Sequence, residues 1–137
     1  MTAKEYLRQA RTLDIEINCK QEELHQLRLK ATGVQAVVIS ERVQSSHENS
    51  SNQIIDKILD LQREINAEIC KLIELKADIR KEINKVNNAI LRTVLTEYYL
   101  NVKTWANIAE KYSYTERNIH YLHGCALKEF SAVANFQ

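Results

Sequence analysis

The sequence predicts an all-α protein in which a long antiparallel helical hairpin or coiled coil precedes a C-terminal three-helix helix-turn-helix. Apolar residues recur at steps of three and four along most of the chain, proline is absent, and glycine occurs only twice in 137 residues. We expect residues 1–90 to form the hairpin and to serve oligomerisation, with a loop at about 33–52. Residues 91–137 are expected to form the helix-turn-helix.

The first predicted helix follows a heptad pattern, with steps of four and three between its apolar residues. One polar residue, Lys20, occupies the seam. The apolar seam residues are Tyr6, Ala10, Leu13, Ile17, Leu24, Leu27 and Ala31. We expect Gly33 to end this helix, a short strand or extended segment to cover 36–39, and the Ser-rich and Asn-rich stretch 40–52 to be a loop.

A second, longer helix is predicted from about Gln53 to Ile90, which corresponds to roughly 55–60 Å of helix. Its seam consists of Ile54, Ile58, Leu61, Ile65, Ile69, Leu72, Ile79, Ile83, Val86 and Ile90. Because an exposed seam of this length would aggregate, we expect the first helix to fold back across it. Since the first helix is the shorter one, we expect a second copy of the chain to cover the remainder, as a homodimer or higher homo-oligomer.

Three short apolar stripes follow, each with the spacing of one helix face. The first stripe comprises Ile90, Leu91, Val94, Leu95 and Tyr98, and ends before Asn101 and Val102. The second comprises Trp105, Ile108, Ala109 and Tyr112, with Thr104 placed as its N-cap. The third comprises Ile119, Leu122, Ala126, Leu127 and Phe130, with Thr115 placed as its N-cap. We expect the three helices to share one small core.

The outer side of the third short helix is the candidate functional surface. At about 100° per residue, Arg117, Tyr121, Gly124 and Lys128 lie nearly opposite Ile119, and His120 lies on the flank. Arginine, histidine and tyrosine can contact DNA bases or phosphates, and glycine lets a helix approach a groove wall closely. An ordinary solvated face of a small helical bundle is the alternative.

From Thr104 to Leu127 the order W-x-x-I-A, a short turn and T-E-R-N-I-H-Y-L-H-G-C-A-L resembles region 4 of bacterial sigma factors. The whole chain resembles small phage-borne regulators of Gram-positive bacteria, the ArpU-like and RinA-like regulators of late phage genes. The opening MTAKEYL, the stretch RVQSS at 42–46 and the Tyr98-Tyr99-Leu100 before Trp105 fit that group.

This resemblance implies a role in transcription regulation, with double-stranded DNA as partner and RNA polymerase as a second candidate partner. It implies that the DNA-binding side is formed by Thr115, Glu116, Arg117, His120, Tyr121 and Lys128. The chain departs from the sigma module at His120-Tyr121, where an Arg-Gln pair is common, and at 111–113, where the turn commonly has glycine.

Composition excludes several other classes. We expect no enzyme activity and no cofactor, because no phosphate loop, nucleophile elbow or paired carboxylate motif is present. No apolar run approaches the ~20 residues that span a bilayer. The three dispersed cysteines suggest reduced thiols, so we expect a soluble, cytoplasmic protein, and the resemblance implies that the cytoplasm is that of a bacterial host cell.

The string His120, His123 and Cys125 is not expected to hold a metal, because Cys125 points to another side of the helix. His123 lies at the edge of the buried arc, where we expect a partly covered structural residue. Two alternatives to the regulator stay open. One is a DNA-packaging protein resembling small terminase subunits. The other is a helical interaction protein that binds RNA polymerase without touching DNA.

Overall fold

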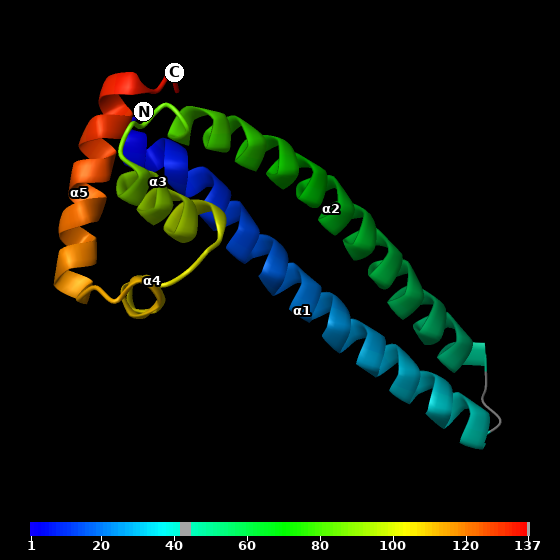
Figure 1. Cartoon of the computed structure of the whole chain (residues 1–137). Coiled ribbons are helices and arrows are strands. Elements are labelled where there is room, and N and C mark those ends of the chain that lie inside the picture. Colours follow the sequence, from blue (N-terminus) through cyan, green and yellow to red (C-terminus); the bar gives the residue numbers. More distant parts are fainter. Residues whose placement is uncertain (42–44, 137) are drawn as a thin grey trace. The chain divides into compact units, whose positions relative to one another are not determined.

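The computed structural model describes the backbone of residues 1–41 and 45–136 and the side chains of residues 1–33 and 52–136. The described residues are helical apart from short turns and the chain ends, with no strand among them, which confirms the predicted all-α class. The elements are α1 (Ala3–Glu41), α2 (Ser45–Ile83), α3 (Ala89–Leu95), the π-helical turn η1 (Thr96–Leu100), α4 (Trp105–Tyr112) and α5 (Glu116–Val133) (Figure 1).

The chain divides into two compact units. Unit 1 contains Met1–Ile15 and Lys71–Gln137, and unit 2 contains Glu16–Cys70. The division differs from the boundary expected at residue 90, because the start of α1 and the end of α2 belong with the three short helices. A set of about forty residues has too little interior to bury a core alone. The core of the three short helices is completed by residues such as Leu7 of α1 and Ile79 of α2, both of which are fully buried.

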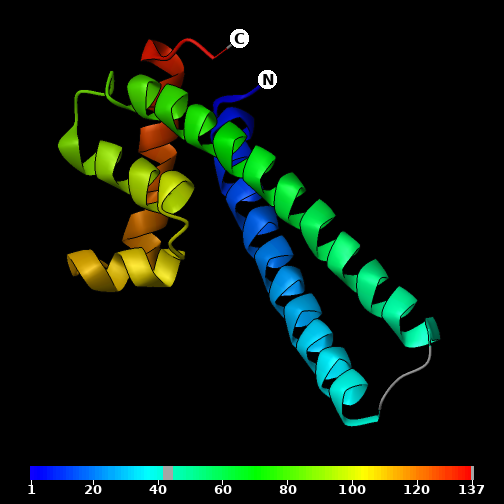
Figure 2. The same cartoon turned by 90° about the vertical axis from the view of Figure 1, so that its right-hand side faces the viewer.

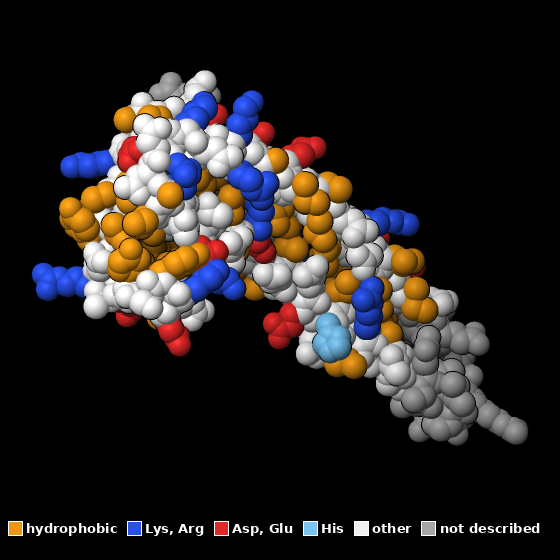
Figure 3. All heavy atoms as spheres, viewed as in Figure 1, with side chains coloured by type: hydrophobic (Ala, Val, Ile, Leu, Met, Phe, Trp, Pro, Cys, Tyr) orange, Lys and Arg blue, Asp and Glu red, His pale blue; other side chains and the backbone are white. Residues whose placement is uncertain are grey.

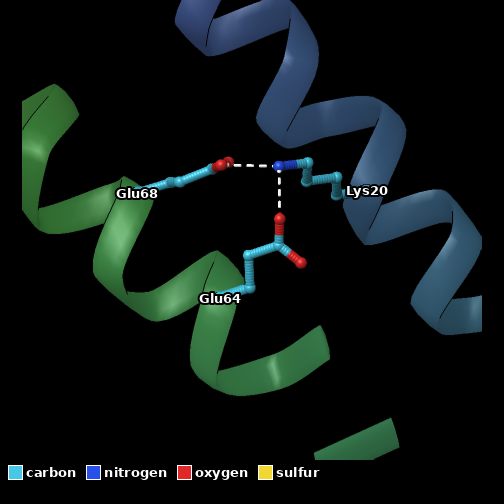
Figure 4. Close-up of polar contacts among 3 residues, drawn as sticks. All are labelled: Lys20, Glu64 and Glu68. Carbon is cyan, nitrogen blue, oxygen red and sulfur yellow. Dashed lines mark hydrogen bonds and ion pairs between the residues drawn. The ribbon is translucent and has the colours of Figure 1, made fainter. Parts of the chain in front are cut away.

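In unit 2, α1 and α2 run antiparallel. Lys20 lies opposite Glu64 and Glu68, whereas Arg28, further along α1, donates to Gln62. Figure 4 shows Lys20 reaching from α1 to both glutamates of α2, with distances from Nζ of 2.9 Å to Glu64 Oε1 and 2.5 Å to Glu68 Oε1. These two hydrogen bonds raise the pKa of Lys20. The single polar position of the predicted seam is therefore satisfied across the helix pair.

Both long helices continue into the stretch of sequence that was predicted to be the loop between them. The predicted helix end at Gly33, the extended segment at 36–39 and the loop at 33–52 are wrong, because α1 continues to Glu41 and α2 begins at Ser45. The connection at 42–44 lies outside the described residues. Glycine costs a helix only about 1 kcal/mol. A Cβ at Gly33 would meet no atom within 4 Å, so the site makes no demand for glycine.

Both long helices have 39 residues, so the first is not the shorter one. The part of the predicted second seam that was expected to stay bare is covered within the chain, because Ile79 and Ile83 of α2 and Val86 of the following turn are at most 1% exposed. The reason for expecting a second copy of the chain on this seam therefore disappears.

The second helix ends at Ile83 rather than near Ile90, which corrects the predicted boundary. Asn88 is the N-cap of α3, and its side-chain oxygen accepts hydrogen bonds from the amides of Ile90 and Leu91. The Arg92 guanidinium donates to the carbonyls of Val86 and Asn87 at 2.6 and 2.9 Å, which holds the turn between α2 and α3. Ile90, the last residue of the predicted seam, is 46% exposed.

The core of unit 1 has two parts. The larger part joins the start of α1 and the end of α2 to α3, η1 and α5. Its fully buried members are Leu7, Ala10, Ile79, Val86, Leu95, Tyr99, Ala126 and Phe130. The smaller part lies among the three short helices and contains Val94, Ile108, Ala109 and Ile119. The predicted shared core of the short helices is thus present.

Candidate nucleic-acid interface

The segment α4–turn–α5 has the build of a helix-turn-helix, two helices joined by a turn of three or four residues. Thr104 and Thr115 are the N-caps of α4 and α5, as predicted, and each hydroxyl accepts a 3.1 Å hydrogen bond from the amide three residues on. Ser113 ends α4 in the left-handed conformation, at φ 60° and ψ 38°. Figures 1 and 2 show α4 lying crosswise to α5 at its beginning.

The two sides of α5 separate as the periodicity predicts. Ile119, Ala126 and Phe130 are fully buried. The exposed residues include all six candidate site residues, Thr115, Glu116, Arg117, His120, Tyr121 and Lys128, together with Gly124. The Thr115 hydroxyl is already engaged as the cap, and Glu116 adds a negative charge to the first turn. Arg117, Tyr121 and Lys128 are therefore the members best placed to contact a partner.

His120 differs from these three because its ring packs against a neighbouring aromatic. The ring centroids of His120 and Trp105 are 5.0 Å apart, and Trp105 stacks on Tyr98 at 3.8 Å. The Arg11 guanidinium of α1 in turn lies over the Tyr98 ring, 4.0 Å from its centre. The outer side of α5 is thus braced, through three rings, against α1. Arg11 was missed by sequence reasoning.

His123 is buried more deeply than predicted, with 8% of its surface exposed. Its Nε2 lies 2.7 Å from the hydroxyl of Tyr99, and the two groups share a hydrogen bond. Burial, followed by the positive charges of Lys4 and His120, lowers the pKa of His123 to about 4. The imidazole ring of His123 is therefore neutral at pH 7. Burial also disfavours the charged form of Tyr99, and so raises the pKa of its hydroxyl.

A buried carboxylate fixes η1 to α4. Glu97 is 5% exposed and accepts hydrogen bonds from Asn101 Nδ2 at 2.6 Å and from Lys111 Nζ at 2.9 Å. The bond from Lys111 holds the pKa of Glu97 below its usual value, against the opposing effect of burial. This contact orients α4, on which the turn to α5 depends.

Charge is unevenly divided between the two units. Unit 1 carries thirteen Lys and Arg against nine Asp and Glu, a net charge of +4, whereas unit 2 carries six against nine, a net charge of −3. Residues 91–137 alone have an excess of only one positive charge, five basic against four acidic residues. The difference arises because unit 1 also contains residues 1–15, with three basic against two acidic residues, and residues 71–90, with five basic against three acidic residues.

Among the described residues, no group of three His, Cys, Asp or Glu side chains is placed to hold a metal ion. Within the same part of the chain, no helix combines the length and apolar character needed to cross a membrane. Comparisons with protein-family models, with curated proteins and with solved structures found no match. The candidate interface is accordingly defined by the geometry of α4 and α5 and by the side chains that α5 exposes.

Proposed function

We propose that the protein is a DNA-binding transcriptional regulator, of the kind that phages and prophages use to control late genes, and that α5 is its recognition helix. It would act in the bacterial cytoplasm, by positioning rather than by chemistry. The observation that carries the proposal is the exposed side of α5, where Arg117, Tyr121 and Lys128 follow a capped helix-turn-helix turn.

The side chains on this side are suited to DNA. Neither Arg117 nor Lys128 forms an ion pair or hydrogen bond with any residue that the structure describes, so both charges are available to phosphates or base edges. Tyr121 is 69% exposed, which is a high exposure for a large aromatic residue, although its hydroxyl interacts with the side chain of Cys125 one turn further along α5. A Cβ at Gly124 would meet nothing within 4 Å, so this position leaves open room beside the helix for a groove wall.

The charge of unit 1 also supports the proposal. Neutralised phosphates release counterions, which supplies most of the sequence-independent affinity of a DNA-binding protein. A net charge of +4 is favourable but moderate. We therefore expect binding that weakens strongly with salt, and a contribution from RNA polymerase or from a second copy of the chain at the target site.

The decisive experiment is selection of bound sequences from a pool of random duplexes by the whole chain, followed by salt titration with the enriched duplex. The variant carrying Arg117→Ala and Tyr121→Ala should lose specific binding while its helical circular dichroism stays unchanged. Arg63→Ala, a charge-matched change in unit 2, should bind like the parent. If the parent enriches no sequence, the regulator proposal is wrong. If the double variant binds like the parent, the assignment of this side of α5 is wrong.

A second candidate function is binding of RNA polymerase without DNA contact. It is favoured by an apolar groove of about 250 Å³ on unit 1. The groove is lined by Ala89, Ile90, Thr93, Val94, Tyr112, Tyr114 and Ile119. Figure 3 shows hydrophobic side chains gathered on the face of unit 1 where α3, α4 and α5 meet. Capture of purified polymerase that survives nuclease treatment, with no enrichment of any duplex, would support this candidate.

The packaging alternative differs in stoichiometry. A small-terminase-like protein would assemble into a ring of many subunits, whereas a regulator requires no more than a dimer. Native mass spectrometry of the whole chain distinguishes the two, because a ring of about eight or more copies would favour packaging.

A further inference from the structure

A pocket of about 220 Å³ lies beside the candidate interface, within unit 1. Lys4 and Arg8 of α1 line it, together with Trp105 at the start of α4 and His120 and His123 of α5. It therefore brings together side chains from opposite ends of the chain. The function proposed above uses none of these side chains except His120.

The charges in the pocket are of one sign. Lys4, Arg8 and His120 are basic, and no residue of its lining is acidic. Neither Lys4 nor Arg8 pairs with a carboxylate that the structure describes. Burial is the largest cause of the lowered pKa of His123, and the nearby positive charges of Lys4 and His120 lower that pKa further.

The rings in the pocket are already engaged with one another. Trp105 is stacked on Tyr98 with an angle of 9° between the planes, and the rings of His120 and His123 lie 5.0 and 4.6 Å from it. A nucleobase would need an open aromatic face on which to stack. The open chemistry is instead that of two long cationic side chains, which suits a compact anion with several acceptor oxygens.

We propose that this pocket binds a phosphate group, and that the group belongs to the backbone of a duplex held by α5. His120 connects the two surfaces, since it lines the pocket and lies on the flank of the exposed side of α5. A duplex strand that passes this flank brings its phosphates to Lys4 and Arg8. The duplex source rests on the proposed function, whereas a free phosphate compound is the alternative source of the same group.

Trp105 provides the reporter, because it is the only tryptophan in the sequence and forms a wall of the pocket. Its fluorescence is followed while the whole chain is titrated with inorganic phosphate and, separately, with the enriched duplex, or with a random-sequence duplex if selection enriches none. The test variant carries Lys4→Gln and Arg8→Gln. The control carries Lys57→Gln and Arg63→Gln, which removes the same charge from exposed positions in unit 2.

We expect a saturable response to phosphate in the parent and the control and its loss in the test variant. We also expect the test variant to bind the duplex about tenfold more weakly at ~0.1 M salt, with the slope of log affinity against log salt smaller by about one. Unchanged circular dichroism shows that the variant is folded.

The outcomes separate the two proposals. If the parent binds duplex but the test variant matches the control and Trp105 does not respond to phosphate, the pocket proposal is overturned and the regulator stands. If the parent binds no duplex but its phosphate response requires Lys4 and Arg8, phosphate binding is supported with a free compound as its source, and the regulator falls. Absence of both responses overturns both.

Discussion

The guanidinium of Arg11 lies over the ring of Tyr98, 4.0 Å from its centre, and donates from the same nitrogen to the carbonyls of Tyr98 and Lys103, at 2.7 and 3.0 Å. One side chain of α1 thus binds the backbone at the C-terminal end of η1 and also the backbone of the segment that leads to α4. Tyr98 in turn stacks on Trp105, the first residue of α4. The orientation of the helix-turn-helix therefore depends on a residue near the start of the chain.

Arg11→Lys should lower the free energy of unfolding by about 2 kcal/mol, because lysine cannot bond both carbonyls and stack on the ring at once. Chemical denaturation followed by circular dichroism measures the change. Arg63→Lys, an exposed arginine of unit 2, is the control and should change stability by less than about 0.5 kcal/mol. A loss at Arg11 no larger than in the control would contradict the bracing role of this residue.

Lys20→Leu should destabilise the protein, because Glu64 and Glu68 would then lie close together without the cation that they share. The second carboxylate oxygen of Glu68, Oε2, is already buried without a hydrogen-bond partner among the described residues. Combining Lys20→Leu with Glu68→Leu should restore the thermal midpoint to that of the parent or above it. Differential scanning calorimetry of the parent, the single variant and the double variant tests this order. A single variant more stable than the parent would show that the ion pairs contribute nothing to folding.

His123 should make stability depend on pH. Its pKa is about 4 in the folded chain and about 6.5 when unfolded, so the unfolded chain binds more protons between these values. The stabilisation is complete above pH 6.5 and is lost as the pH falls toward 4. Between pH 7.5 and pH 5.0 the loss from this residue should be about 2 kcal/mol.

Urea denaturation at the two pH values, on the parent and on His123→Gln, isolates this contribution. The glutamine amide can still bond the Tyr99 hydroxyl but does not titrate. The variant should therefore lose about 2 kcal/mol less than the parent over the same interval. Equal losses in the two proteins would show that His123 is not responsible.

Val102 stands at φ 57°, in the left-handed region that β-branched residues rarely adopt. Val102→Gly should leave stability unchanged or raise it by up to about 1 kcal/mol, because relief of backbone strain offsets the added freedom of the unfolded chain. Val133→Gly, at the end of α5, should instead destabilise by roughly 0.3–0.5 kcal/mol. Thermal melts of the parent and the two variants measure these changes. If Val102→Gly is destabilised, the backbone at this position is not strained.

Apolar periodicity was sufficient to predict that the helices exist, though not where the two long ones meet and where the second ends, because each helix needs one buried side whichever partner covers it. The caps Thr104 and Thr115 and the exposed side of α5 were predicted for the same local reason. The end of α2 at Ile83 had a signal as well, since Asn87-Asn88 follows four residues later and asparagine is a favoured N-cap.

The sequence patterns did not indicate which residues far apart in the chain contact each other. Arg11 and Tyr98 are 87 residues apart, and no spacing rule connects them. The depth of His123 depends on Tyr99 and on α1 as much as on its own helix. The pocket with Lys4 and Arg8 escaped prediction for this reason, because residues from α1 were not counted with the C-terminal helices.

The packing of Tyr6 against Phe130 and Phe136, with ring centroids 6.2 and 5.6 Å apart, has a consequence for biosynthesis. While residues 130–136 are still inside the ribosome, Tyr6 lacks both rings against which it packs. Unit 1 must therefore await the emergence of residues 130–136 before it reaches its native state, and a product terminated before them would present its unfilled interior to chaperones and proteases.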